Sequence, residues 1–136
     1  MAGRLPDEVD LDAVLAPTLA LVPSPSELID ADRAIARLGA AVLGGERIGL
    51  LTDYDADGLT SHAVLAHALT RFGVPRSQLS HWIGHRIDDG YGISENLVDQ
   101  LLASEVRPEV VISADCGSSD HQTIARLAAA GIDVIV

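Results

Sequence analysis

The sequence has a single cysteine, Cys116, so the chain cannot form an internal disulfide bond, which fits a reducing compartment such as the cytoplasm. Aromatic residues make up only 3% of the 136 residues, which argues against an aromatic-rich β-sandwich. No apolar run reaches the roughly 18 residues that a membrane-spanning helix needs, and the polar, acidic residues 1–10 do not resemble a signal peptide. We therefore expect a cytoplasmic protein that does not engage a membrane.

Basic residues are also scarce. Nine arginines and lysines stand against 20 acidic residues, which gives a formal net charge of −11. A chain this acidic is not expected to bind nucleic acid through a broad basic surface. If it handles phosphate groups, metal ions must supply much of the attraction.

Helical patterns alternate with apolar strand patterns from about residue 30 onward. Helical spacing occurs at 31–43, 59–73, 94–105 and 118–131, and nearly continuous apolar runs occur at 47–53, 79–84, 109–115 and 132–136. This alternation predicts an α/β fold with a mainly parallel sheet and helices on both faces. Residues 1–29 carry four prolines and are expected to form an irregular N-terminal arm that precedes the α/β domain at 30–136.

Four aspartates stand at the ends of two predicted strands. Asp53, Asp55 and Asp57 occupy alternate positions after the first apolar run, and Asp115 ends the third. Because ligands of open α/β sheets bind beyond the carboxyl ends of the strands, we expect these side chains at one edge. If the segment after Asp53 stays extended, the alternate spacing points the three early carboxylates in a similar direction. Hard divalent cations prefer oxygen ligands and offset the repulsion between carboxylates, so the pattern favours a metal site.

Two other interpretations apply to the stretch DYDADG at 53–58. A solvated turn accounts for aspartate and glycine, but turns seldom need acidic residues at three alternate positions. An EF-hand loop matches over its first six positions. Its twelfth position, however, falls on Val64, where a bidentate glutamate is required, and a predicted strand precedes it instead of a helix. We therefore reject the EF-hand interpretation.

Three stretches, taken in order, resemble successive motifs of the DHH phosphoesterases. They are GLLTDYDADGLTSHAVL at 49–65, GHRIDDGYGIS at 84–94 and VISADCGSSD at 111–120. The chain is most similar to the RecJ-type single-strand-specific exonucleases, and the likeness covers most of it from Asp30 on. The resemblance implies the N-terminal part of a DHH phosphoesterase domain, with metal-dependent hydrolysis of single-stranded DNA from an end, in DNA repair or recombination.

The same resemblance implies roles for the four aspartates, which are the candidate catalytic residues. Asp55, Asp57 and Asp115 are the implied metal ligands, and Asp53 is expected to orient ligands or water from behind them. The implied cofactors are two Mn²⁺ or Mg²⁺ ions, which hold the scissile phosphate and lower the pKa of a water molecule. The family often has a histidine where Leu51 stands here, which points to a changed metal site and not to its loss.

The stretch GHRIDDGYGIS at 84–94, which we call the glycine-rich loop, supplies the candidate substrate-binding residues Arg86, Tyr91 and Gly92, which match a family loop, and the neighbouring His85. An arginine can pair with a phosphate, and a tyrosine can stack on a base or sugar. The alternative is a loop whose glycines only permit tight turns. For residues 117–119, which precede a predicted helix, we expect a helix cap.

The Asp-His-His motif that names the family is expected after the apolar run at 132–136, where this sequence stops. We therefore expect a fragment that has little nuclease activity by itself. Two alternatives to the exonuclease stay open. One is a phosphodiesterase of the same superfamily that acts on oligonucleotides or cyclic dinucleotides, and the other is a non-catalytic relative that binds DNA or a replication protein.

Overall fold

The structure is a computed structural model that describes residues 16, 18, 22, 24–85, 87 and 90–136. Residues 1–33 and 34–136 form two compact units. Most of the predicted N-terminal arm lies outside the described residues. In the described part of the first unit, the Ser24 hydroxyl accepts the N–H of Ser26 and caps a short 3-10 helix, η2 (Pro25–Glu27).

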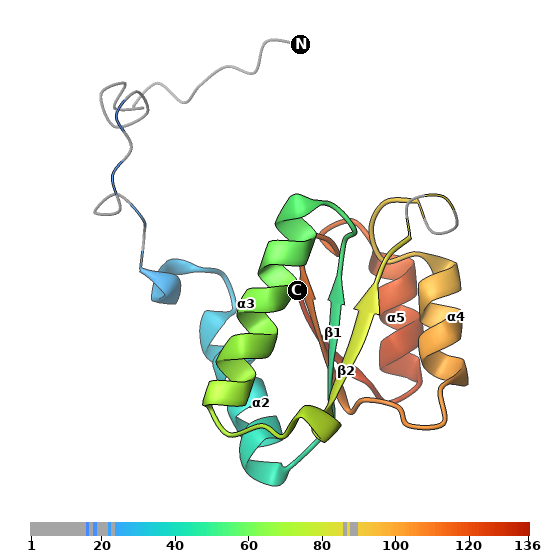
Figure 1. The fold of residues 1–136 in the computed structure, drawn as a ribbon, viewed down its shortest axis with the longest axis horizontal. Coiled ribbons are helices and arrows are strands. Elements are labelled where there is room, and N and C mark those ends of the chain that lie inside the picture. Colours follow the sequence, from blue (N-terminus) through green and yellow to red (C-terminus); the bar gives the residue numbers. More distant parts are fainter. Residues whose placement is uncertain (1–15, 17, 19–21, 23, 86, 88–89) are drawn as a thin grey trace. The chain divides into compact units, whose positions relative to one another are not determined.

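Four parallel strands form one sheet in the order β2-β1-β3-β4 (Figure 1). Their bounds are β1 (Ile48–Thr52), β2 (Leu79–Ile83), β3 (Val110–Ala114) and β4 (Asp133–Ile135). The longer helices are α2 (Ala31–Gly44), α3 (Ala56–Arg71), α4 (Glu95–Ala103) and α5 (His121–Ala129), and η3 (Arg76–Gln78) leads into β2. The predicted α/β fold is therefore confirmed. Within the described residues, no helix combines the length and apolar character needed to cross a bilayer.

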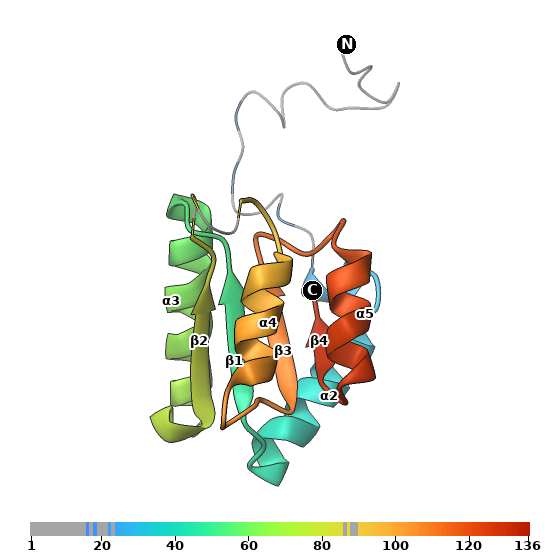
Figure 2. The same ribbon diagram turned by 90° about the vertical axis from the view of Figure 1, so that its right-hand side faces the viewer.

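Helices cover both faces of the sheet, as the apolar strands predict. Figure 2 shows α4 and α5 in front of the sheet and α2 and α3 behind it. Successive side chains of a strand point to opposite faces, so Leu50 packs with α2 and α3 while Leu51 packs with α4 and α5. All of β1 is buried, which is typical of a central parallel strand and explains why its sequence lacks polar alternation.

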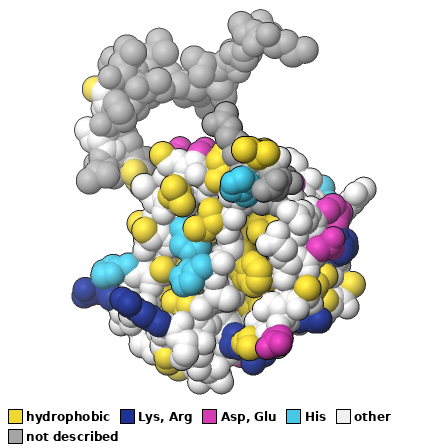
Figure 3. Space-filling model, turned by 45° about the vertical axis from the view of Figure 1, so that its right-hand side comes forward, with side chains coloured by type: hydrophobic (Ala, Val, Ile, Leu, Met, Phe, Trp, Pro, Cys, Tyr) yellow, Lys and Arg dark blue, Asp and Glu magenta, His cyan; other side chains and the backbone are white. Residues whose placement is uncertain are grey.

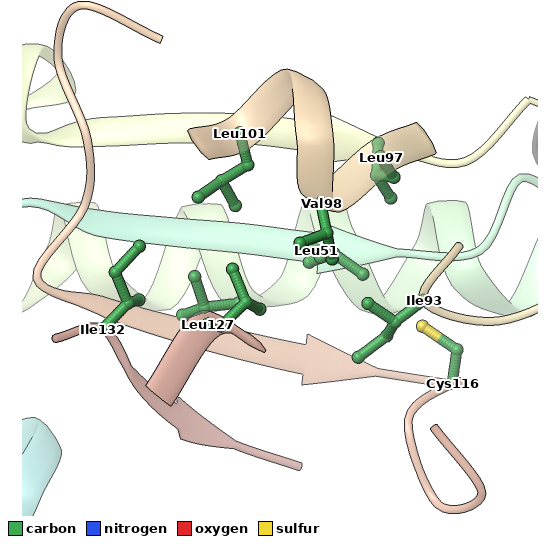
Figure 4. Close-up of a cluster of buried hydrophobic side chains, with 9 residues drawn as sticks. Leu51, Ile93, Leu97, Val98, Leu101, Cys116, Leu127 and Ile132 are labelled. Atoms are coloured by element: carbon green, nitrogen blue, oxygen red, sulfur yellow. The ribbon is translucent and has the colours of Figure 1, made fainter. Parts of the chain in front are cut away.

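The core on the α4–α5 face extends up to the carboxyl ends of the strands (Figure 4). Leu97 and Leu101 of α4 and Leu127 of α5 pack with Leu51 there. Burial of each such side chain is worth roughly 1.5–3 kcal/mol. Ile93 and Cys116 belong to the same cluster but come from two loops at the carboxyl edge, so the core anchors both loops.

A hydrogen-bonded series of polar side chains connects β1, α3 and β2. The Nδ1 atom of His62, a residue only 8% exposed, lies 2.9 Å from Thr52 Oγ1, and its Nε2 atom lies 2.7 Å from Nδ1 of His81. Burial, and then the neighbouring His81 ring, lowers the pKa of His62 below its ordinary value. Figure 3 shows histidine side chains gathered on one face of the molecule.

We predict that His62 makes the chain less stable as the pH falls. A histidine whose pKa is lower in the folded state stabilises the fold above its unfolded pKa, near 6.5, and this contribution is lost as the pH falls through the folded pKa. In His62→Asn the unfolding free energy should fall less steeply between neutral pH and pH ~5. Urea unfolding of the 136-residue chain, monitored by the fluorescence of its single tryptophan, Trp82, measures how the unfolding free energy changes with pH.

The matched control is His67→Asn, at an exposed position of the same helix. A wild-type slope in His62→Asn would contradict the prediction.

Candidate metal centre

The parallel register brings two predicted aspartates out of neighbouring strands together. Thr52 at the end of β1 pairs with Ala114 at the end of β3, so Asp53 and Asp115 follow at the same level of the sheet. On the other side of β1, the N–H of Gly84, which follows β2, donates to the carbonyl oxygen of Thr52 at 3.1 Å. The carboxyl ends of three strands thus form the floor of the site.

Three carboxylates converge above this floor. Asp53, Asp55 and Asp115 each offer an oxygen, and these oxygens all lie within 4.8 Å of one another. We call these three residues the acidic group. Asp53 is 2% exposed, and its Oδ1 accepts the N–H of Tyr54 at 2.8 Å, whereas Asp55 and Asp115 are exposed. The expected convergence of the first and third strand ends is therefore observed.

The chain turns into helix α3 directly after Asp55, so the segment through Asp57 is not extended and the common direction that an extended path would give does not apply. Asp55 Oδ1 accepts the N–H groups of Asp57 and Gly58, at 3.0 and 2.9 Å, and so caps the helix. These N–H groups have no partner inside a helix, and a capping carboxylate satisfies them. Asp57 consequently lies in the first turn of α3 and is not a member of the acidic group. Its role as a metal ligand stays a prediction.

Gly58 is the residue that permits this tight turn. A Cβ atom at position 58 would lie 2.2 Å from the carbonyl oxygen of Asp53 and 2.6 Å from its carbonyl carbon. Both contacts are with backbone that cannot rotate away. A side chain at this position would therefore displace the segment that carries Asp53 and Asp55.

The acidic group is electrostatically strained without a counter-charge. Desolvation, and then the charge of Asp55 and a hydrogen bond with it, raises the pKa of Asp115 above its ordinary value. Asp115 also has a positive φ of 64°, a conformation that aspartate and asparagine tolerate better than most residues. A donor set made of carboxylate oxygens fits a hard divalent cation such as Mn²⁺ or Mg²⁺, whose charge would relieve the repulsion.

The glycine-rich loop brings one predicted substrate residue to the acidic group. The Tyr91 hydroxyl donates to the carbonyl oxygen of Asp115 at 3.4 Å, and the Tyr91 side chain is 73% exposed. Desolvation, and then the charge of Asp115, raises the pKa of Tyr91. Gly92 is buried, and His85 is exposed just beyond β2. Arg86 lies outside the described residues, so the structure does not place it.

The sequence analysis did not predict the contact that Asp120 makes near the site. We expected residues 117–119 to cap the following helix, but α5 begins at His121 and Asp120 occupies the capping position. The Asp120 side chain does not cap α5 either, because its Oδ2 accepts the N–H of Ile93. These two residues are 27 positions apart, so no local pattern reveals the contact.

Comparison with known proteins agrees with the motifs and the geometry. A family model described as "DHH family, N-terminal domain" matches residues 47–136. Over 90% of the chain the sequence is 37% identical to the single-stranded-DNA-specific exonuclease RecJ of Thermus thermophilus. Over 81% it is 34% identical to the protein of the same name from Escherichia coli. The chain spans 17% and 18% of the length of these two relatives.

Solved structures also resemble the fold, among them two crystal structures of RecJ. A crystal structure of exonuclease RecJ bound to manganese matches with a TM-score of 0.69 and 36% identity, over 88% of this chain and 28% of that chain. The crystal structure of RecJ from Thermus thermophilus in complex with Mn²⁺ matches with a TM-score of 0.63 and 32% identity, over 90% of this chain and 16% of that one. These two structures are both manganese complexes.

Proposed function

The chain belongs to the DHH family, and from this premise we propose that it is the metal-binding part of an exonuclease that cuts single-stranded DNA from an end. The observation that carries the proposal is the acidic group, whose three oxygens lie within 4.8 Å of one another at the carboxyl edge of the sheet. The relatives named above are single-strand-specific exonucleases, and the solved ones bind manganese.

We assign the cation site to the acidic group, with Asp57 as a further ligand from the first turn of α3. Mn²⁺ or Mg²⁺ bound there supplies Lewis acidity that polarises the phosphate and lowers the pKa of a water molecule. Asp53 is held by the Tyr54 N–H, so its carboxylate has a fixed orientation. The Asp55 carboxylate caps α3 through Oδ1, so this ligand is tied to the start of the helix.

For the substrate we assign the loop that contains Tyr91. Its exposed ring lies next to Asp115, and a nucleotide whose phosphate reaches the acidic group can stack its base or sugar there. Gly92 lets the backbone of the loop pass close to Asp120. His85 and Arg86 remain candidates for phosphate contacts. Because the chain has a net charge of −11, the bound cation must offset repulsion from the DNA backbone.

The test is a cleavage assay on the purified natural protein that contains this sequence. With Mn²⁺ present, end-labelled single-stranded DNA should be degraded from one end, duplex DNA should resist, and chelation of the metal should stop the reaction. Faster hydrolysis of dinucleotides than of long strands would favour the oligonucleotide or cyclic-dinucleotide phosphodiesterase. Binding of DNA without hydrolysis would favour the non-catalytic relative.

The 136-residue chain alone serves as a further arm of this assay, and it should show little cleavage. Divalent cations of this kind take about six donors, and two ions need protein ligands around both. The chain offers four carboxylates for this purpose and spans 17% of the length of its Thermus relative. Turnover by the 136-residue chain close to that of a full-length homologue, abolished by Asp55→Ala, would contradict this expectation. A cytoplasmic location and a role in DNA repair or recombination stay predictions.

A further inference from the structure

Asp120 starts helix α5 but does not use its carboxylate there. An aspartate at this position normally accepts a backbone N–H from the first turn of its own helix. Here Asp120 Oδ2 instead accepts the N–H of Ile93 at 2.8 Å, from the glycine-rich loop. The backbone of Asp120 is fixed independently, because its N–H donates to Gly117 and its carbonyl oxygen accepts from Ile124. The Asp120 side chain therefore does not cap α5 and instead stabilises the position of the glycine-rich loop.

The contact with the loop is close at a second residue. Gly92 has a φ of 85°, and a Cβ atom there would lie 2.7 Å from Asp120 Oδ2. Only glycine suits both the conformation and the space. Ile93 is 2% exposed and lies in the same buried cluster as Cys116. The Asp120 carboxylate thus holds Ile93 against the segment that follows β3 and lies close beside Gly92.

This contact joins the two loops at the metal centre. The residue before Gly92 is Tyr91, whose hydroxyl donates to the carbonyl oxygen of Asp115. Asp115 and Asp120 stand at the two ends of the short segment between β3 and α5. Holding Ile93 to one end of that segment therefore helps to place Tyr91 at the other end, where Asp115 of the acidic group lies.

We infer that Asp120 is a positioning residue, which orders the glycine-rich loop so that Tyr91 meets the nucleotide next to the scissile phosphate. The inference deepens the proposed function and rests on it. Asp120 belongs to neither the acidic group nor the surface that would contact DNA in this proposal. Its loss should therefore weaken substrate binding more than the chemical step, and should leave the metal requirement unchanged.

The variant that separates this role from a structural one is Asp120→Ser in the natural protein. Serine caps helices as well as aspartate does, so α5 is preserved, but its shorter side chain cannot reach the Ile93 N–H. We expect KM for single-stranded DNA to rise about tenfold, which is the upper range for the loss of one hydrogen bond, with kcat and the Mn²⁺ dependence near wild type. Hydrogen exchange of the Ile93 amide should become faster.

Three further variants complete the test. Asp120→Asn keeps an oxygen acceptor and should restore a KM near wild type, and Gln122→Ala, at an exposed position of α5, is the neutral control. In a Tyr91→Ala background, Asp120→Ser should add no further increase in KM, because the two residues act as one unit. Unchanged KM and unchanged Ile93 exchange in Asp120→Ser would overturn the inference while leaving the proposed function intact. A wild-type protein that does not cleave single strands would instead overturn the proposed function.

Discussion

Replacing Asp115 with asparagine is expected to reduce metal-dependent cleavage of single-stranded DNA by the natural protein at least about a thousandfold, which corresponds to several kcal/mol of lost charge stabilisation. Asparagine is the appropriate replacement because Asp115 has a φ of 64°, which asparagine tolerates. Of the three residues of the acidic group, Asp115 is the one that follows β3, while Asp53 and Asp55 follow β1. Steady-state cleavage at saturating Mn²⁺ measures the loss.

The same substitution should not harm the fold. Because desolvation, and then the charge of Asp55, raises the pKa of the Asp115 carboxyl, replacing it with a neutral amide removes an unfavourable charge from the metal-free chain. We therefore expect the metal-free Tm to stay equal or rise, while the increase in Tm that Mn²⁺ gives the wild type disappears. The control is Glu105→Gln, which removes an exposed carboxylate from the loop that leads into the amino end of β3. Normal cleavage by Asp115→Asn would show that the Asp115 carboxylate is not part of the catalytic site.

Replacing Gly58 with alanine is expected to destabilise the chain by about 1–3 kcal/mol and to abolish its response to Mn²⁺. The added Cβ would lie 2.2 Å from the Asp53 carbonyl oxygen, so the turn between β1 and α3 must open. That movement displaces Asp53 and Asp55 together, because one precedes the turn and the other caps the helix within it. Urea unfolding and Mn²⁺-dependent Tm measurements on the 136-residue chain report the two effects.

The matched control for this change is Gly39→Ala in α2. A Cβ atom at position 39 has no neighbour within 4 Å. In a helix interior, alanine is favoured over glycine by about 0.5–1 kcal/mol, so this variant should be more stable than wild type. Equal behaviour of the two glycine variants would show that the close approach at Gly58 is not what shapes the site.

Local sequence patterns determined the fold class and most of the elements. The central strands are nearly all apolar because helices cover both faces of the sheet, and this produces the continuous runs at Ile48–Thr52 and Val110–Ala114. Ser94 precedes α4, and its hydroxyl accepts the N–H of Leu97. The apolar runs placed Asp53 and Asp115 at the ends of two strands, and the motif resemblance identified a family that the comparison confirms.

The same patterns did not decide between two local structures that compete after the first strand. An extended segment and a helix start are both compatible with aspartates at alternate positions after a strand. The observed choice is the helix, because the Asp55 carboxylate satisfies two N–H groups of the first turn and Gly58 allows the close approach to Asp53. This choice decides that Asp53, and not Asp57, joins Asp55 and Asp115 in the acidic group.

Only the tertiary structure decided the contacts between distant segments. The Asp120 carboxylate reaches Ile93 across 27 positions, and the histidine ring at position 62 meets His81 across 19. A side chain's partner in such a contact depends on which strands lie side by side and on how the loops pack on the core. The periodicity of a sequence indicates which face of a helix or strand is buried. It does not indicate which residues of a distant loop will contact that face. The register of β1, β2 and β3 determines these contacts, because it aligns the ends of the three strands and so brings the loops that follow them together.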